Sequence, residues 1–280
     1  MQPIIDYFST IPSAHRSAFL VGGITLFMLI ENGIPLLKLR YNRWAHLGIN
    51  IFFTFTTILV NFLMAFILVK AGDWAIASNF GLLSWLPTMP TGLYLIVGLL
   101  GLDLIGAYTA HWVSHRVKWI WRFHLIHHTD QYVDTTTANR HHPVESVFRF
   151  LMTTLGVVLI GAPAWLVMAY QTLSALISQF EHANISLPSG LDKAISWVII
   201  SPNMHKVHHH YVLPYTDSNY GNIFAIWDRL FGTYMSLDPT KIVYGVDTHM
   251  KKEETANIGK MLTLPFEGYR PPVGAKFEKE

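Results

Sequence analysis

The 280-residue chain contains no cysteine. This absence excludes disulfides, thiolate-held zinc and iron–sulfur clusters, because each needs cysteine sulfur. Charge is also scarce: Asp, Glu, Lys and Arg make up 14% of the residues, whereas soluble domains carry about a quarter. The formal net charge is only +2, and no Lys/Arg-rich block favours nucleic acid as a partner. With 51% hydrophobic residues, the composition predicts a membrane protein.

Several catalytic motifs are also missing. The HExxH motif of zinc proteases does not occur, and neither does the ExxH pair of ferritin-type di-iron bundles. GxSxG, the P-loop and GxGxxG are absent as well, so hydrolase, nucleotide and dinucleotide chemistry have no support.

Long apolar stretches predict an all-α integral membrane protein with about four transmembrane helices. The expected membrane segments are 17–37, 48–69, 93–113 and a helical hairpin over 146–181. Gly161 and Pro163 interrupt the last stretch, so we interpret it as a hairpin that enters the membrane and returns. We expect residues 114–145 and 182–240 to form a helical cap, and 241–280 a polar tail, within a single domain over 1–280.

The Lys and Arg residues predict the orientation of these segments. Residues 38–47 and 114–145 are basic, whereas the 71–92 loop contains neither Lys nor Arg. The positive-inside rule therefore places the N-terminus outside and the cap in the cytoplasm. Because the chain is short and has no endoplasmic-reticulum retrieval signal, we expect it in a bacterial inner membrane.

Histidine is concentrated in one part of the chain. Twelve of the 15 histidines lie between His111 and His210. "HLIHH" at 124–128 and "HKVHH" at 205–209 each place histidines at i, i+3 and i+4, and "HWVSH" at 111–115 places two at i, i+4. On a helix these positions share one face.

Such clusters indicate a metal site, since imidazole is the commonest protein ligand for transition metals. Eight or nine imidazoles are too many for one ion and enough for two. Haem ligation would leave most of them unexplained. Two alternatives remain open: a protein that binds or transports divalent metals without redox catalysis, and a histidine-based pH sensor without metal.

The same motifs, in the same order, resemble the fatty acid hydroxylase/sterol desaturase superfamily of membrane di-iron oxygenases. The resemblance covers residues 95–235 and rests on "DLIGAYTAHWVSH", "HLIHH", "HHPVE", "FEHAN", "HKVHH" and "NYGNIFAIWDRLFGTY". Within the superfamily the chain is most similar to bacterial relatives of alkylglycerol monooxygenase and sterol desaturases. One position departs from the family pattern: Trp112 stands where an Arg is usual after the first histidine.

The resemblance implies an O2-dependent hydroxylase or desaturase that acts on a C–H bond of a fatty acyl, alkyl or sterol-like membrane lipid. It implies two iron ions, which zinc could replace, in the cytosolic cap, and electrons from a separate donor. The implied metal ligands are His111, His115, His124, His127, His128, His182, His205, His208 and His209.

Asp103, His142 and Glu145 are expected around these ligands rather than among them. An intramembrane carboxylate is usually functional or paired, so Asp103 could accept a proton from a ligand imidazole. His142 and Glu145 could orient or complete the site. His141 and His210 point away from the shared helix faces and are expected to be at the surface.

Overall fold

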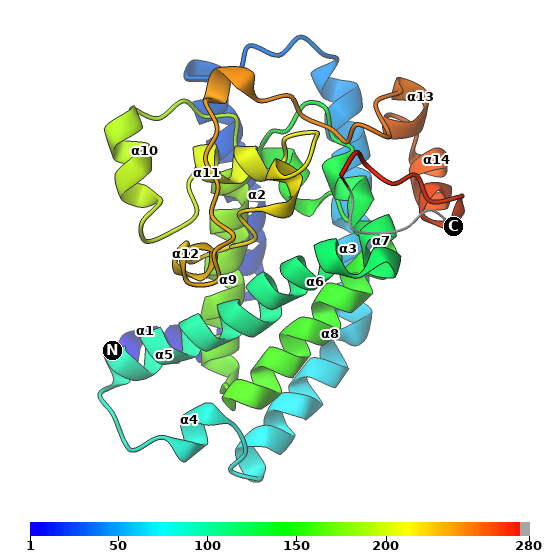
Figure 1. Cartoon of the computed structure of the whole chain (residues 1–280). Helices are drawn as coiled ribbons and strands as arrows, with labels where there is room; N and C mark the ends of the chain where they lie inside the picture. Colours follow the sequence, from blue (N-terminus) through cyan, green and yellow to red (C-terminus); the bar gives the residue numbers. More distant parts are fainter. Residues whose placement is uncertain (275–280) are drawn as a thin grey trace.

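A computed structural model describes residues 1–274 as an assembly of helices (Figure 1). In this part of the chain β-structure is limited to three isolated bridges. The long helices are α2 (Ser13–Gly33), α3 (Arg43–Ala77), α8 (Pro143–Ile160), α9 (Ala164–His182) and a continuous rod made of α5 (Thr91–Asp103), the π-helical segment η1 (Leu104–Thr109) and α6 (Ala110–Arg116). The shorter α-helices are α1 (Gln2–Ser9), α4 (Leu82–Trp85), α7 (Lys118–His128), α10 (Ser189–Ile195), α11 (Pro202–His208), α12 (Ile226–Leu230), α13 (Lys252–Thr255) and α14 (Ile258–Thr263). Single 3₁₀ turns are η2 (Thr135–Asn139), η3 (Tyr215–Asp217), η4 (Pro239–Lys241) and η5 (Leu264–Phe266).

Four of the helical stretches are long and apolar enough to cross a bilayer. They are Ser13–Gly33, Arg43–Trp85, Thr91–Arg116 and Pro143–Ile160. Large side chains on α3 face outward, for example Phe62 with 76% of its surface exposed, as expected for a helix in contact with lipid. The all-α membrane prediction is therefore confirmed, although α3 continues to Ala77, into a stretch expected to be loop.

The predicted hairpin consists of α8 and α9, which turn at Gly161. Gly161 has a φ of +70°, in the left-handed region where a residue without Cβ fits best. It contacts the backbone of Gly81, so a Cβ on Gly81 would lie 2.3 Å from the Gly161 nitrogen. In the bundle α8 packs along α3, and α9 packs along α2.

The short helices α10, α11, α13 and α14 lie at one end of the long helices, opposite α4 (Figure 1). The expectation of a polar tail over 241–280 is wrong for its described part, up to residue 274. Val246, Met261 and Leu264 are buried in an apolar cluster with Phe53 and Trp121. Burying these apolar side chains stabilises the fold of this segment against α3 and α7.

Candidate metal centre

One group of buried imidazoles comes from α6, α7 and α11. Their ligand nitrogens all lie within 4.8 Å of one another. We call this set the five-histidine group; its members are His111, His115, His124, His128 and His208. The i, i+4 spacing on α6 and on α7 directs each pair of rings toward the same point.

A second group, the four-histidine group, is formed by His127, His182, His205 and His209. All four side chains are buried. The Nε2 atom of His182 lies 2.9 Å from Nε2 of His205 and 3.2 Å from Nε2 of His127, and the Nε2 atoms of His205 and His209 are 3.1 Å apart. Helices α7, α9 and α11 thus meet at one point.

The two groups adjoin because neighbouring histidines divide between them. His127 and His128 are consecutive on α7, and His208 and His209 are consecutive at the end of α11; in each pair one ring belongs to each group. Consecutive residues on a helix point about 100° apart. The rings of His128 and His209 stack with centroids 4.8 Å apart. The repeated triplet therefore serves two adjacent centres.

The nitrogen separations fit a metal ion at each centre. Nitrogens bound to one ion at about 2.1 Å lie about 3.0–3.4 Å apart in an octahedral or tetrahedral shell. The separations in the four-histidine group fall close to this range, and the Nε2 atoms of His124 and His128 in the five-histidine group are 3.2 Å apart. Imidazole donors suit iron and zinc. The structure thus brings together all nine predicted ligands in an arrangement that could bind metal.

Carbonyl oxygens orient two of these rings. Nδ1 of His111 lies 2.9 Å from the carbonyl oxygen of Tyr220, and Nδ1 of His208 lies 2.6 Å from that of Ser218. A carbonyl can only accept, so each Nδ1 carries the hydrogen and Nε2 keeps its lone pair. Both Nε2 atoms are buried without a hydrogen-bond partner among the described residues. This is the arrangement that metal binding requires.

Glu145, at the start of α8, contacts the five-histidine group as expected. Its Oε1 lies 2.7 Å from Nδ1 of His124 and 2.9 Å from Nδ1 of His141.

The expectation that His141 lies at the surface is wrong: its ring is buried and stacks on the ring of His127, with centroids 4.8 Å apart. The expectation for His142 is also wrong, since its Nδ1 accepts from Val144 N and caps α8. The cap geometry turns His142 away from the site.

Burial sets the protonation of the histidines that lie outside the membrane segments. Desolvation first, and then the neighbouring imidazoles, lower their pKa values well below the ordinary value. This holds for His127, His128, His205, His208 and His209. Neutral imidazole is the form that binds a metal ion, so at neutral pH no proton has to leave these rings first.

Asp103 connects the third membrane segment to the cap. Its carboxylate accepts from the backbone nitrogens of Ile223 and Phe224, at 3.2 and 3.1 Å, and from Nε1 of Trp227 at 3.0 Å. Among the described residues the hydrogen bonds of Asp103 go to the cap and none joins it to a ligand imidazole, so the structure gives no support to the hypothesis that it accepts a proton from one. The intramembrane carboxylate is paired with the cap instead.

Asp228 holds the backbone next to the ligands. It accepts from the nitrogens of Tyr220 and Gly221, at 2.7 and 2.9 Å, and from the Thr233 hydroxyl at 2.7 Å. These bonds fix the residue whose carbonyl orients His111. The motif "NYGNIFAIWDRLFGTY" thus positions a ligand without supplying one.

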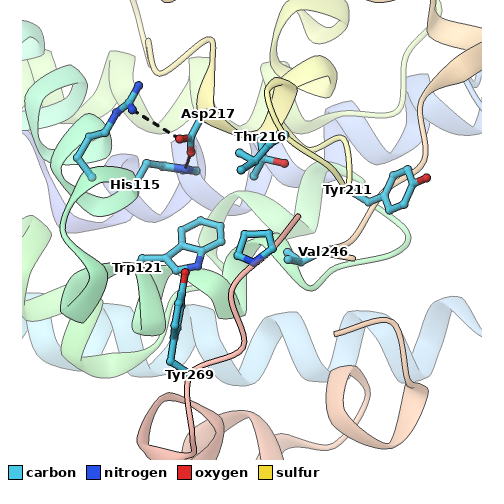
Figure 2. A pocket seen from close by; sticks show the side chains of 10 residues that line it. His115, Trp121, Tyr211, Thr216, Asp217, Val246 and Tyr269 are labelled. Atoms are coloured by element: carbon cyan, nitrogen blue, oxygen red, sulfur yellow. Dashed lines mark hydrogen bonds and ion pairs between the residues drawn. The ribbon is translucent and has the colours of Figure 1, made fainter. Parts of the chain in front are cut away.

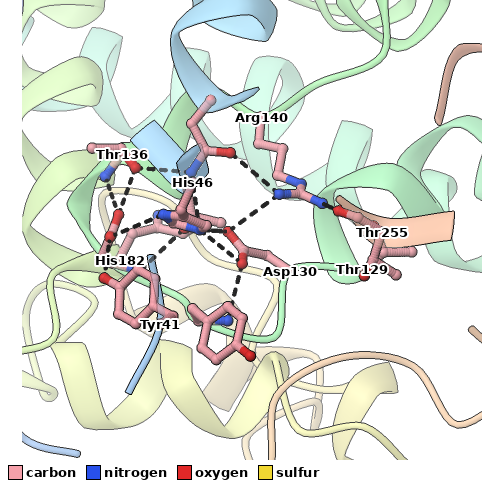
Figure 3. Close-up of polar contacts among 12 residues, drawn as sticks. Tyr41, His46, Thr129, Asp130, Thr136, Arg140, His182 and Thr255 are labelled. Atoms are coloured by element: carbon pink, nitrogen blue, oxygen red, sulfur yellow. Dashed lines mark hydrogen bonds and ion pairs between the residues drawn. The ribbon is translucent and has the colours of Figure 1, made fainter. Parts of the chain in front are cut away.

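A buried polar network that the sequence did not suggest supports the cap (Figure 3). His46 on α3 contacts Asp130 at 2.8 Å and Asp134 at 3.2 Å. Arg140 lies 3.7 Å from Asp130 and donates to the Thr255 carbonyl at 2.8 Å. Burial would raise the pKa of Asp130, but the charges of His46 and Arg140 outweigh it and hold the pKa well below its usual range. The network fixes the segment between α7 and α8 against α3.

Glu31, near the end of α2, is also tied to the cap. Its Oε2 accepts from the backbone nitrogens of Thr135 at 3.3 Å and Asn184 at 3.0 Å. These bonds anchor α2 beside the four-histidine group.

Two spaces reach the histidines from different sides. A small pocket of about 60 Å³ lies on the cap side, where Trp121, Tyr269 and Asp217 surround His115 (Figure 2). Asp217 contacts Nδ1 of His115 at 3.3 Å and Arg116 at 3.7 Å. Arg116 thus lies beside His115, with Asp217 between them.

The larger space is a cavity of about 580 Å³ between helices α3, α8 and α9. It ends at His141, beside a narrow cleft of about 20 Å³ whose walls include histidines of both groups. Several side chains, including Ala138 and Arg149, line both spaces, so the cavity and the cleft adjoin. A membrane-soluble molecule in the cavity would therefore lie next to the histidines.

The chain is similar to a known family and to several named proteins. The family described as Fatty acid hydroxylase matches residues 95–233. Ornithine lipid hydroxylase OlsE of Rhizobium tropici is 28% identical over 54% of this chain and 44% of its own length. Alkylglycerol monooxygenase of Xenopus tropicalis is 29% identical over 54% of this chain and 32% of its own length.

A cholesterol 25-hydroxylase-like protein of Danio rerio is 25% identical over 52% of this chain and 53% of its own length. The chain thus spans less than two thirds of each of these relatives. No solved structure matches it.

Proposed function

We propose that the protein is an O2-dependent hydroxylase or desaturase of a membrane lipid, because residues 95–233 match the fatty acid hydroxylase family. The proposal includes two iron ions, one in the five-histidine group and one in the four-histidine group. The named relatives are hydroxylases and monooxygenases, which supports oxidation of a C–H bond in a fatty acyl, alkyl or sterol-like lipid.

One observation carries the proposal: nine buried imidazoles form two adjoining groups beside a cavity between membrane helices. A metal transporter would need ligands along the spans, whereas here they lie at one end. A pH sensor would need imidazoles that titrate near neutral pH, whereas burial lowers the pKa of the cap histidines well below that range.

When bound, the irons would supply the redox chemistry of O2. The chain's own residues would hold the ions, exclude water and position the lipid. Tyr220, Ser218 and Glu145 orient ligand rings. The cavity between α3, α8 and α9 would admit a lipid from the bilayer and set the depth of the oxidised carbon. Glu145 and Asp217 would balance part of the ions' positive charge through the imidazoles.

Electrons would come from a separate donor protein or reductant on the cap side. The Lys and Arg pattern supports a cytoplasmic cap, and the similarity to a bacterial lipid hydroxylase supports a bacterial inner membrane. Residues 114–145 and 182–240 would act with the membrane segments as one unit, because Asp103 and Glu31 bind cap backbone.

Metal content tests the proposal directly. The protein would be purified in detergent without metal-affinity resin and measured by elemental analysis beside the double variant His208→Ala, His209→Ala. We expect about two irons per chain in the native protein and a lower content in the variant, because the variant removes one ligand from each group. His15→Ala, a histidine outside both groups, is the matched control. Metal well below one per chain in the native protein would contradict the proposal.

The reaction needs a second measurement. Purified protein with a chemical reductant, O2 and an extract of bacterial lipids would be followed by mass spectrometry. A gain of one oxygen atom would indicate hydroxylation, and a loss of two hydrogen atoms desaturation. Metal-loaded protein that changes no lipid and consumes no O2 would favour metal binding or transport instead.

A further inference from the structure

Arg149 is a charged residue in a membrane helix; its charge acts on the buried Glu181 carboxyl, but the two side chains form no ion pair. It lies on α8, within the candidate span Pro143–Ile160. Among residues 1–274 no side-chain hydrogen bond or ion pair involves its guanidinium, not even with Glu145 one turn away, which contacts His124 instead. An intramembrane charge is costly and is normally paired or functional. Arg149 borders the large cavity, so a partner could reach it there.

The cavity has both polar and apolar walls. Thr57, Ser174 and Asn222 line it together with Arg149 near the cap. Leu68 and Met168 line it farther along α3 and α9, away from the cap. A lipid with a polar group and an apolar chain matches these walls when its polar group lies at Arg149, toward the histidines; Arg16 on α2 borders the same cavity farther from the cap.

Arg149 also borders the narrow cleft whose walls include His124, His127 and His205. A group bound to the guanidinium would therefore lie next to the proposed irons. The carbons attached to that group would be the part of the lipid nearest the reaction.

We propose that Arg149 binds an anionic group, a carboxylate or a phosphate, of the lipid substrate, so that oxidation occurs at carbons close to this group. This proposal rests on the proposed function, because it takes the cavity as the substrate site. Arginine binds both anions through paired hydrogen bonds. The apolar chain would extend along Leu68 and Met168, away from the cap.

Binding of matched probes tests the proposal without turnover. Titration calorimetry of the full chain in detergent would compare dodecanoate, dodecyl phosphate and the neutral methyl dodecanoate. We expect at least one anionic probe to bind about tenfold to a hundredfold more tightly than the ester, since a charged hydrogen bond has this effect. The tighter of the two anions would identify the group as carboxylate or phosphate.

Four variants test whether Arg149 causes the preference for anionic probes. Arg149→Gln should abolish it, and Arg149→Lys should retain part of it. Arg16→Gln removes the other arginine that borders the cavity and should leave the preference intact. Lys70→Gln, on α3 outside the cavity, controls for loss of a charge. Equal binding of ester and anions by the native protein, or a preference that survives Arg149→Gln, would overturn the proposal.

The two proposals fail separately. Suppose that the protein binds no metal or oxidises no lipid, but still prefers anionic probes in a manner that depends on Arg149. This result would overturn the proposed function and leave the proposal for Arg149 standing. If Arg149→Gln does not fold, the native comparison of ester with anions and the Arg149→Lys titration still decide the question.

Discussion

The two histidine groups lie side by side but differ in how their rings are held. In the five-histidine group the Nδ1 atoms of four rings contact an oxygen acceptor: His111, His115, His124 and His208. In the four-histidine group only His182 does so, with the Ser178 carbonyl at 2.7 Å. Within the described residues, Nδ1 of His127, His205 and His209 has no hydrogen-bond partner.

The rings of the five-histidine group are therefore held more rigidly than those of the four-histidine group. An acceptor on Nδ1 fixes the ring and raises the basicity of the other nitrogen, and such contacts change metal affinity about 10–100-fold. We therefore expect the five-histidine group to bind its ion more tightly and the four-histidine group to release its ion first.

The largest expected effect on metal content comes from removing two ligands of the four-histidine group. His205→Ala with His209→Ala should lower the metal content from about two ions to about one per chain and abolish lipid oxidation, because the remaining two ligands cannot hold an ion. Elemental analysis is the measurement, with His15→Ala as control. Loss of both ions would show that the five-histidine group depends on its neighbour.

One carboxylate beside each histidine group tests the difference in metal affinity between the groups. Glu145→Gln should weaken metal binding in the five-histidine group about 10–100-fold, since Glu145 contacts His124 at 2.7 Å. Glu181→Gln is the matched variant beside the four-histidine group, where the carboxylate lies 3.9 Å from His205. It should change the affinity much less. Competition with a coloured chelator measures both, and equal effects would remove the distinction.

Asp103→Asn should have a smaller effect that concerns the five-histidine group alone. It weakens three hydrogen bonds to the segment that carries the Tyr220 carbonyl. We expect the free energy of unfolding to fall by about 1–3 kcal/mol. Thermal unfolding in detergent measures it, with the exposed Asp73→Asn on α3 as control. An unchanged melting temperature would mean that the carboxylate does not hold the cap.

Acid should destabilise the metal-free protein gradually. Burial lowers the pKa of His124 to about 4, below the value of about 6.5 in an unfolded chain. The unfolded chain therefore binds the proton first, and the free energy of unfolding falls as the pH drops from 6.5 toward 4. Unfolding curves at several pH values, with and without iron, test this. A metal-free protein that is equally stable at pH 7 and pH 5 would contradict it.

Much of the metal centre could be predicted because helical spacing is local. The positions i, i+3 and i+4 in "HLIHH" and "HKVHH" already place their rings on one side of a helix. The division between two groups could not be predicted, since it depends on how α9 and α11 meet α7. Whether the nine histidines bind metal remains a prediction.

The errors in the sequence interpretation have long-range causes. His141 and His142 are neighbours, and only the cap of α8 decides which one faces Glu145. The pair of His46 and Asp130 joins residues 84 positions apart, a separation that leaves no local signal. Residues 241–280 are mostly polar, but a few apolar residues among them, such as Met261, pack on α7.

The π-helical segment η1 has a consequence for helix phase. Asp103 and His111 are eight residues apart, which in a regular α-helix would place them about 80° apart around the axis. One residue absorbed by η1 brings them to within about 20°, so both face the loop that contains Tyr220 and Ile223. Deleting one residue from Leu104–Thr109 should therefore be tolerated better than inserting one, which would rotate His111 away. In this stretch the number of residues, more than their identity, keeps the carboxylate and the imidazole aligned.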